Sequence, residues 1–170
     1  VNGNHCTADA GGLVFAGFFF GVGARPLEWQ SLGWNLILKE MPCQILEDGV
    51  DFEGSIAYHR FVTELFFWPA KFRQISGKEI PKNYIKILLL MADFIESYTK
   101  PNGMVPLWGD ADDGRVLPFG GQSLNDHSYL PDLIRFQWGE NKSCFSSAKA
   151  KGEILWTYGI RDNFSDRVGV

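Results

Sequence analysis

Apolar residues recur at helical spacing in several long segments of the sequence, and segment Lys82–Tyr98 shows this spacing most clearly. Counting from Ile85, the positions i+3, i+4 and i+7 are the apolar residues Leu88, Leu89 and Ala92. This pattern is typical of an α-helix that buries one face. No segment of useful length alternates apolar and polar residues as a half-buried strand would. The sequence therefore predicts an all-α protein with no sheet of more than two short strands.

Five further helices are expected from apolar runs bounded by glycine, proline and polar residues. Their ranges are 6–20, 26–41, 56–74, 128–138 and 148–158. Pro42 should end the second of these helices and Pro69 should kink or break the third, because proline removes a helix hydrogen bond. Gly11, Gly12 and Gly17 lower the helix propensity of the first, but they would allow a neighbouring helix to pack closely.

Composition and charge exclude several classes of partner. The formal net charge of −4 gives no electrostatic case for nucleic acid, and an anionic ligand would need local cations or hydrogen-bond donors. No apolar run reaches the roughly 18 residues of a membrane span, so no membrane partner is expected. Cys6, Cys43 and Cys144 lack metal-ligand spacing and are interpreted as small buried or half-buried thiols.

Residues 44–59, QILEDGVDFEGSIAYH, join an acidic turn to the start of a helix. Ser55 is expected to be the N-cap, because its hydroxyl can accept a hydrogen bond from the first turn. Tyr58 and His59 then lie near the mouth of the helix, where a phenol and an imidazole are well placed for proton transfer. The alternative is a half-buried tyrosine at a helix start beside a surface histidine.

Four blocks occur in a fixed order, namely Gly3-Asn4-His5, the apolar run GLVFAGFFF, residues 44–59, and GDADDGR at Gly109–Arg115. In this order they resemble the N-terminal helical domain of the heparinase II/III-like polysaccharide lyases, and the resemblance extends from Asn2 to about Trp156. It implies an incomplete (α/α) toroid, followed by a C-terminal β-sandwich domain that this sequence lacks. We therefore expect residues 1–158 to be part of the toroid and residues 159–170 to be a tail toward the missing domain.

The same resemblance implies bacterial degradation of a uronate-containing polysaccharide, such as heparan sulfate or alginate, by β-elimination and without a cofactor or metal. In the family, the asparagine of the GNH motif neutralises the uronate carboxylate, and the tyrosine of the YH motif is the general acid and in some members the base. These roles carry over to Asn4 and Tyr58, with His5 as a third catalytic candidate that assists proton abstraction or holds substrate. From the residues alone, the favoured interpretation of Asn4-His5 is a helix cap with a neighbouring bystander.

Further candidates for substrate contact lie in the later blocks: His59, Gln44, Glu53, Trp108 and Arg115. Gln44 and Glu53 match family positions but could instead order the loop. Trp108 could stack on a sugar ring or belong to the core.

The aspartates of the GDADDGR block, Asp110, Asp112 and Asp113, resemble a calcium loop at first sight. The bidentate glutamate of an EF-hand is missing, so no metal is expected. We expect instead an ordered acidic loop in which Arg115 pairs with an aspartate. His127 is expected next to a helix cap and outside the catalytic group.

Two features depart from the family pattern. Asp51 stands where some members carry a histidine, and its charge would repel a uronate unless the side chain is turned away. The β-sandwich domain, which supplies a further catalytic histidine in the family, is absent, so this segment alone is expected to be inactive. The alternative function is therefore a noncatalytic carbohydrate-binding or structural domain of a glycan-assembly protein. Localisation stays open, although a typical lyase would be periplasmic or secreted.

Overall fold

The computed structural model describes residues 3–111, 114–119, 121–139 and 148–159, and these form six helices. The helices are α1 (Gly3–Phe20), α2 (Ala24–Gln44), α3 (Ile56–Ile75), α4 (Lys82–Tyr98), α5 (Tyr129–Trp138) and α6 (Ala148–Tyr158). The described residues contain no strand, and an isolated antiparallel bridge joins Ile45 to Asp51. The predicted all-α class is confirmed for this part of the chain.

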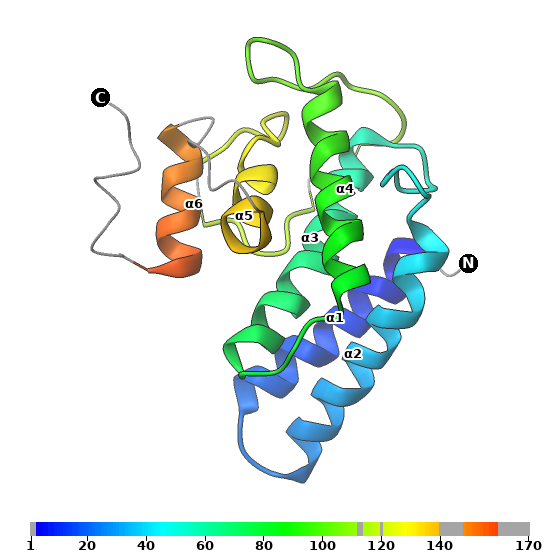
Figure 1. Ribbon diagram of the computed structural model, residues 1–170, viewed down its shortest axis with the longest axis vertical. Coiled ribbons are helices and arrows are strands. Elements are labelled where there is room, and N and C mark those ends of the chain that lie inside the picture. The colour runs from blue at the N-terminus through cyan, green and yellow to red at the C-terminus, as the bar shows by residue number, and fades with distance from the viewer. Residues whose placement is uncertain (1–2, 112–113, 120, 140–147, 160–170) are drawn as a thin grey trace.

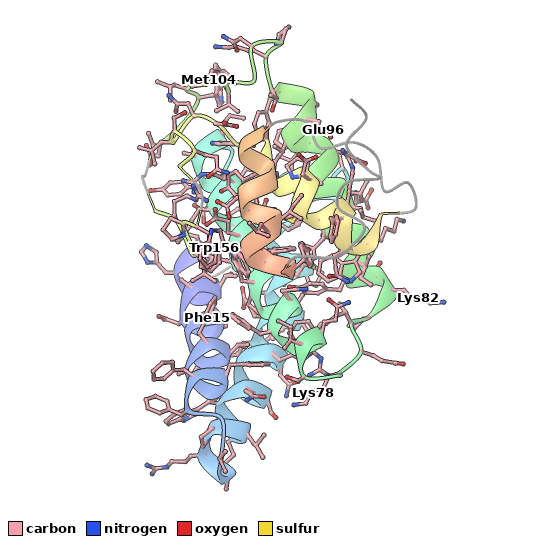
Figure 2. The ribbon with its side chains drawn as sticks, turned by 90° about the vertical axis from the view of Figure 1, so that its left-hand side faces the viewer. Phe15, Lys78, Lys82, Glu96, Met104 and Trp156 are labelled. Atoms are coloured by element: carbon pink, nitrogen blue, oxygen red, sulfur yellow. The ribbon has the colours of Figure 1, made fainter. Side chains whose placement is uncertain are left out.

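Helices α1 and α2 form a long antiparallel hairpin whose tip projects beyond the other helices (Figures 1 and 2). Helix α3 packs against α1, α2, α4 and α5, and α5 also contacts α6. The N-terminal end of α1 lies beside the C-terminal end of α2 and the loop that leads into α3 (Figure 1). The hairpin therefore brings the first and third sequence blocks into one region.

Helix α3 is the centre of the core, because every residue from 62 to 71 is buried. Its aromatic residues Phe66, Phe67 and Trp68 pack with the apolar faces of the surrounding helices. Burying large aromatic side chains is among the strongest contributions to folding, at roughly 25 cal/mol per Å² of apolar surface. This rigid helix carries Tyr58 and His59 in its first turn.

Pro42 does not end its helix as predicted, and Pro69 does not break its helix, whereas a kink at Pro69 stays a prediction. Helix α2 continues through Pro42 to Gln44, and α3 continues through Pro69 to Ile75 without the expected break. Pro69 is buried and lies next to Gly11 of α1, where an added Cβ would be 3.8 Å from its ring. Burial of the surrounding turns outweighs the roughly 3 kcal/mol that an internal proline costs.

The glycines of α1 differ in their roles. At Gly17 an added Cβ would lie 2.5 Å from the backbone oxygen of Pro26, so only glycine allows α1 and α2 to come this close. At Gly33 of α2 an added Cβ would likewise lie 2.5 Å from the Ala10 oxygen. An added Cβ at Gly12 would have no neighbouring atom of the described residues within 4 Å, so its predicted role in close packing is wrong.

Two remaining expectations concern thiols and membranes. Cys6 is half-buried, but Cys43 is exposed, which corrects the expected burial, and Cys144 lies outside the described residues. Cys43 faces solvent because it lies in the last turn of α2, where its thiol donates to the Lys39 carbonyl. Among the described helices, none combines the length and apolar character that crossing a membrane requires.

Candidate functional site

The start of α1 is held against the loop that precedes α3. Asn4 donates its backbone N–H to Glu53 Oε1 at 2.9 Å, and its side-chain Nδ2 lies 2.9 Å from Glu53 Oε2 and 3.2 Å from Oε1. The carbonyl of Gly3 accepts a hydrogen bond from Gln44 Nε2 at 3.1 Å. Two blocks that are more than forty positions apart in sequence are thus in direct contact.

Gln44 is fully enclosed beneath this contact. Its Oε1 accepts from Thr7 Oγ1 at 3.0 Å, and its Nε2 also donates to Glu40 Oε2 at 3.0 Å. A side chain with no exposed surface and with its amide engaged at both ends has little left for a ligand. The geometry favours the interpretation in which Gln44 orders the loop over direct substrate contact.

The GDADDGR block reaches the same region through the N-terminus of α3. Ser55 is the N-cap as predicted, since its Oγ accepts from Tyr58 N at 3.2 Å. The Ser55 hydroxyl donates to the Asp110 carbonyl, and Ile56 N donates to the Trp108 carbonyl at 3.1 Å. Gly109 has a φ of +76°, and an added Cβ there would lie 2.8 Å from Ser55 Cα. Glycine is therefore required at the point where the loop touches the helix.

The three catalytic candidates differ in exposure, with His5 exposed and Asn4 and Tyr58 half-buried. Asn4 and His5 lie in the first turn of α1, and Tyr58 lies in the first turn of α3. Glu53 links the two starts, because it binds Asn4 and precedes the N-cap Ser55 by two residues. The prediction that all three side chains line one cleft stays a prediction.

A pocket of about 210 Å³ lies beside this region, between the start of α3 and the loops at 105–111 and 124–127. Its lining includes Ile56, Trp108, Asp110 and His127. The side chain of Trp108 is 72% exposed, which excludes the core position and leaves a flat aromatic face in solvent. An exposed tryptophan next to a pocket of this size is suited to stacking on a sugar ring.

His59 is 1% exposed, so the structure does not place it at the surface. Its Nδ1 accepts from Asp51 N at 3.3 Å, and its Nε2 therefore carries the proton and donates to the Met91 carbonyl at 3.3 Å. Burial lowers the pKa of His59 to about 4, so the ring is neutral at physiological pH. With both ring nitrogens engaged, His59 is better suited to fixing the loop than to contacting substrate.

Asp51 is also enclosed, with its Oδ2 accepting from Glu53 N at 3.3 Å. Its Oδ1 is buried with no hydrogen-bond partner among the described residues. Burial, reinforced by the nearby charge of Glu53, raises the pKa of Asp51 to about 7. The Asp51 carboxyl group is hence turned away from solvent. This is the orientation expected if a uronate is to bind nearby without being repelled by its charge.

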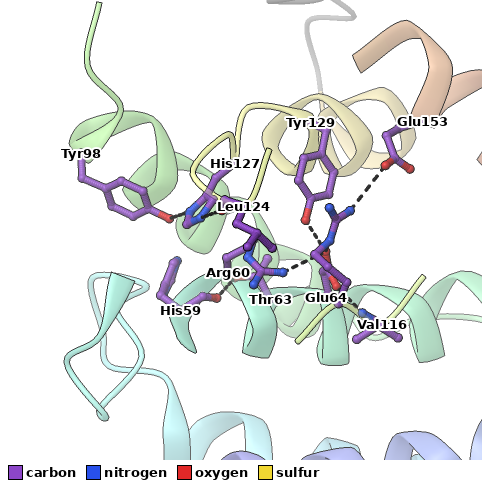
Figure 3. A network of polar contacts seen from close by, with 11 residues as sticks. His59, Arg60, Thr63, Glu64, Tyr98, Val116, Leu124, His127, Tyr129 and Glu153 are labelled. Carbon is purple, nitrogen blue, oxygen red and sulfur yellow. Dashed lines mark hydrogen bonds and ion pairs between the residues drawn. The ribbon is translucent and has the colours of Figure 1, made fainter. Parts of the chain in front are cut away.

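Arg115 pairs with Glu64, which lies in the buried polar network that Figure 3 shows. Its Nε donates to Glu64 Oε1 at 2.7 Å, its Nη2 lies 3.4 Å from Glu153 Oε1, and its guanidinium covers the ring of Tyr129. Glu64 also accepts from Tyr129 OH and, at 2.6 Å, from Val116 N. Among the described residues, the ion-pair partners of Arg115 are glutamates of α3 and α6 and not Asp110, and a pairing with Asp112 or Asp113 lies outside the described residues.

Sequence reasoning missed Glu64. The signal was available, because Glu64 stands in the apolar run VTELFF of a helix that is otherwise buried at this level. A carboxylate in such a run requires charged or hydrogen-bonding partners. One partner, Arg60, lies four positions before Glu64 at 3.6 Å and follows from helix spacing, whereas the other partners lie more than fifty positions away and could not be predicted.

His127 belongs to the same buried layer (Figure 3). Its Nε2 donates to the Leu124 carbonyl at 3.1 Å, so its Nδ1 accepts the hydroxyl proton of Tyr98 at 3.0 Å. Burial lowers its pKa to about 3, with the charge of Arg60 as a further cause. His127 lies two residues before α5, close to the cap residue Ser128 as the sequence suggested.

No group of three or more potential ligands in the described part of the chain could hold a metal ion. Asp112 and Asp113 lie outside the described residues, so their share of the acidic-loop prediction is untested.

Comparison with known proteins adds independent information. The sequence model of the family described as Heparinase II/III N-terminus matches residues 1–138. The chain is 30% identical over 112 residues to the heparin-sulfate lyase of Pedobacter heparinus, which covers 64% of this chain and 17% of that protein. It is 26% identical over 113 residues to the heparin-sulfate lyase of Bacteroides stercoris, and this match covers 65% of this chain and 17% of that protein. The chain thus spans a small part of the relatives that it matches, and no solved structure matches it significantly.

Proposed function

The chain belongs to the heparinase II/III N-terminal family, and on this basis we propose that the full-length protein is a polysaccharide lyase that cleaves uronate-containing glycans by β-elimination. The observation that carries the proposal is the contact of Asn4 with Glu53. This contact joins the GNH block to the block that carries Tyr58. This contact supports the proposal, because Asn4 and Tyr58, the proposed catalytic residues, lie at helix starts that it connects.

In the proposed reaction, the amide of Asn4 binds the uronate carboxylate and stabilises the negative charge that develops when the C5 proton leaves. His5, exposed next to Asn4, assists removal of that proton or holds the substrate. The electron pair of the C5–H bond forms the C4–C5 double bond as the bond from C4 to the glycosidic oxygen breaks. Tyr58 gives its phenolic proton to the departing oxygen.

The substrate class follows from the relatives, which are named heparin-sulfate lyases. We propose a heparan-sulfate-like uronan as substrate, with alginate-like chains as the second choice. Trp108 would stack on a sugar ring at the rim of the pocket. We further propose that the helices form part of an (α/α) toroid and that a β-sandwich domain of the full-length protein completes the site.

The test is an ultraviolet assay of the full-length protein and its Tyr58→Phe and Asn4→Ala variants. Elimination produces an unsaturated uronyl end that absorbs in the ultraviolet, so heparan sulfate, alginate and related uronans can be assayed in parallel. Tyr58→Phe keeps the ring but removes the proton donor, and the rate should fall by about 10²–10⁴-fold. Asn4→Ala should also lower the rate, because the developing enolate loses its partner.

Asn35→Ala is the matched control, because Asn35 is exposed on the distant middle of α2 and should leave the rate unchanged. Thermal unfolding of each variant separates loss of chemistry from loss of fold. Wild-type protein that is inert on every uronan, or a Tyr58→Phe variant as fast as wild type, would favour the noncatalytic carbohydrate-binding alternative.

A further inference from the structure

Glu53 binds Asn4, whose amide is proposed to meet the carboxylate of the substrate. We propose that Glu53 is a positioning residue, which holds the Asn4 amide with one N–H directed at the uronate carboxylate and does not itself bind the glycan. This inference rests on the proposed function and deepens it, since it assigns a role to Glu53 that differs from the substrate contact predicted from sequence.

The orientation of the Asn4 amide is set by chemistry. Both Glu53 oxygens lie within hydrogen-bond distance of Asn4 Nδ2, at 2.9 and 3.2 Å. A carboxylate only accepts hydrogen bonds, so the amide nitrogen must face it, and the reversed amide would place oxygen against oxygen. The backbone N–H of Asn4 donates to the same carboxylate at 2.9 Å, which restrains the main chain together with the side chain.

The same geometry leaves part of the amide available. The two oxygens of a carboxylate lie close together. The angle that they form at Asn4 Nδ2 is therefore much smaller than the angle between the two N–H bonds of the amide. A single N–H of Asn4 is therefore shared between both oxygens of Glu53. Among the described residues, the second N–H and Oδ1 of Asn4 have no other hydrogen-bond partner, and an N–H is the group that a uronate carboxylate needs.

Electrostatics argues against direct contact between Glu53 and the substrate. Two carboxylates in contact repel each other, whereas a carboxylate and an amide N–H attract. Glu53 is half-buried, and both of its carboxylate oxygens accept hydrogen bonds from Asn4. A carboxylate so placed can orient the asparagine without facing the ligand.

The position of Glu53 is fixed by hydrogen bonds that connect it to α3. Its backbone N–H donates to Asp51 Oδ2, and the Asp51 N–H donates to the buried ring of His59. On the other side, Gly3 leaves room for the carboxylate, because an added Cβ there would lie 3.0 Å from Glu53 Oε1. A chain of contacts thus runs from His59 in α3 to Asn4 in α1. Through this chain the buried histidine helps to position Asn4.

The test is a double-mutant cycle in the full-length protein, with Asn4→Ala, Glu53→Gln and the double variant. Glutamine keeps the shape of Glu53 but offers one acceptor oxygen, so the amide of Asn4 is no longer fixed. We expect kcat to fall by about 10²-fold, the usual effect of misplacing a catalytic group by about 1 Å, while KM changes by less than about threefold. In the Asn4→Ala background, Glu53→Gln should cause no further loss.

Glu47→Gln is the control, since it removes the same charge from an exposed position of the same loop and should leave kcat and KM unchanged. Losses that multiply in the double variant would show that Glu53 acts independently of Asn4 and would overturn the proposal. A rise in KM at constant kcat would overturn it in favour of direct substrate contact.

A second readout does not depend on activity. The loss of Tm in the double variant should be smaller than the sum of the two single losses, because each single change breaks the same contact. Additive losses of Tm would overturn the contact itself. Wild-type protein without lyase activity would overturn the proposed function, while the Tm cycle would still decide whether Glu53 holds Asn4.

Discussion

Glu53 and Glu64 are glutamates of neighbouring segments that accept several hydrogen bonds, yet their surroundings differ. Glu64 has a side chain that is 1% exposed and is neutralised by Arg115, with Tyr129 and Val116 as further donors. Glu53 is half-buried, accepts from neutral groups of Asn4, and has no cation within 4.0 Å among the described residues.

The difference separates a structural carboxylate from one that can serve a site. Around Glu64 both carboxylate oxygens accept hydrogen bonds from the protein, and Arg115 extends the network to Glu153, so the contacts join α3, α5 and α6. Around Glu53, one N–H of the Asn4 amide has no partner in the described part of the chain, and the exposed His5 follows Asn4 in sequence. Saturated contacts stabilise a fold, whereas incompletely used donors at a half-buried position can bind a ligand.

The largest effect is expected when the network around Glu64 is broken. Glu64→Gln leaves Arg115 buried without its nearest negative charge, and the free energy of unfolding should fall by about 3–5 kcal/mol. Urea denaturation followed by tryptophan fluorescence measures this change. The control is Glu96→Gln, because Glu96 also pairs with an arginine, Arg135, but is 52% exposed. Its cost should stay below about 1 kcal/mol. Equal losses for both variants would contradict the conclusion that the buried network around Glu64 contributes more to stability than an exposed ion pair.

A smaller effect should come from Asp51, which lies beneath Glu53. Its pKa of about 7 exceeds the ordinary value of 3.8, so between these values the folded protein holds a proton that the unfolded chain has lost. Stability from this group is therefore present below pH 4 and is lost as the pH rises toward 7. Asp51→Asn removes the titration and should stabilise the protein by about 2–4 kcal/mol at pH 8, with little effect near pH 4.

Urea denaturation at both pH values tests the Asp51→Asn prediction. Asp9→Asn, which makes the same change of charge at an exposed position of α1, is the matched control. If Asp51→Asn were destabilising at pH 8, the carboxylate would be making a favourable contact there, and the sign of the pKa shift would be wrong.

The smallest effect is expected at Trp108, an exposed residue of the pocket lining. Trp108→Ala should weaken binding of a uronate oligosaccharide to the full-length protein by about 0.5–1.5 kcal/mol, which is roughly two- to tenfold in Kd. Stability should hardly change, because Trp108 is mostly exposed. Trp156→Ala removes a tryptophan that is 69% exposed on α6 but is outside the pocket lining, and it should leave Kd unchanged. Isothermal titration with both variants decides whether the tryptophan at the pocket is special.

Features that depend on local sequence could be predicted well. Helices α4 and α6 have the predicted bounds, and Ser55 caps α3 as expected, because periodicity and capping act over one or two turns. The family was also recognisable, since its four blocks keep their order along the chain. The local rule failed at Pro42, and Pro69 does not break its helix, because packing of the whole helix outweighs the cost of the proline ring.

The sequence by itself determined which chemical groups are present, where most helices run and which family the chain resembles. Only the tertiary structure decided that Glu53 binds Asn4, that Arg115 pairs with Glu64 and Glu153, and that Trp108 faces solvent. These partners are separated by 38 to 51 positions, and each carboxylate had several possible donors along the chain. Helix packing selects among them, because a buried charge is tolerated only where the fold brings a matching group within hydrogen-bond distance.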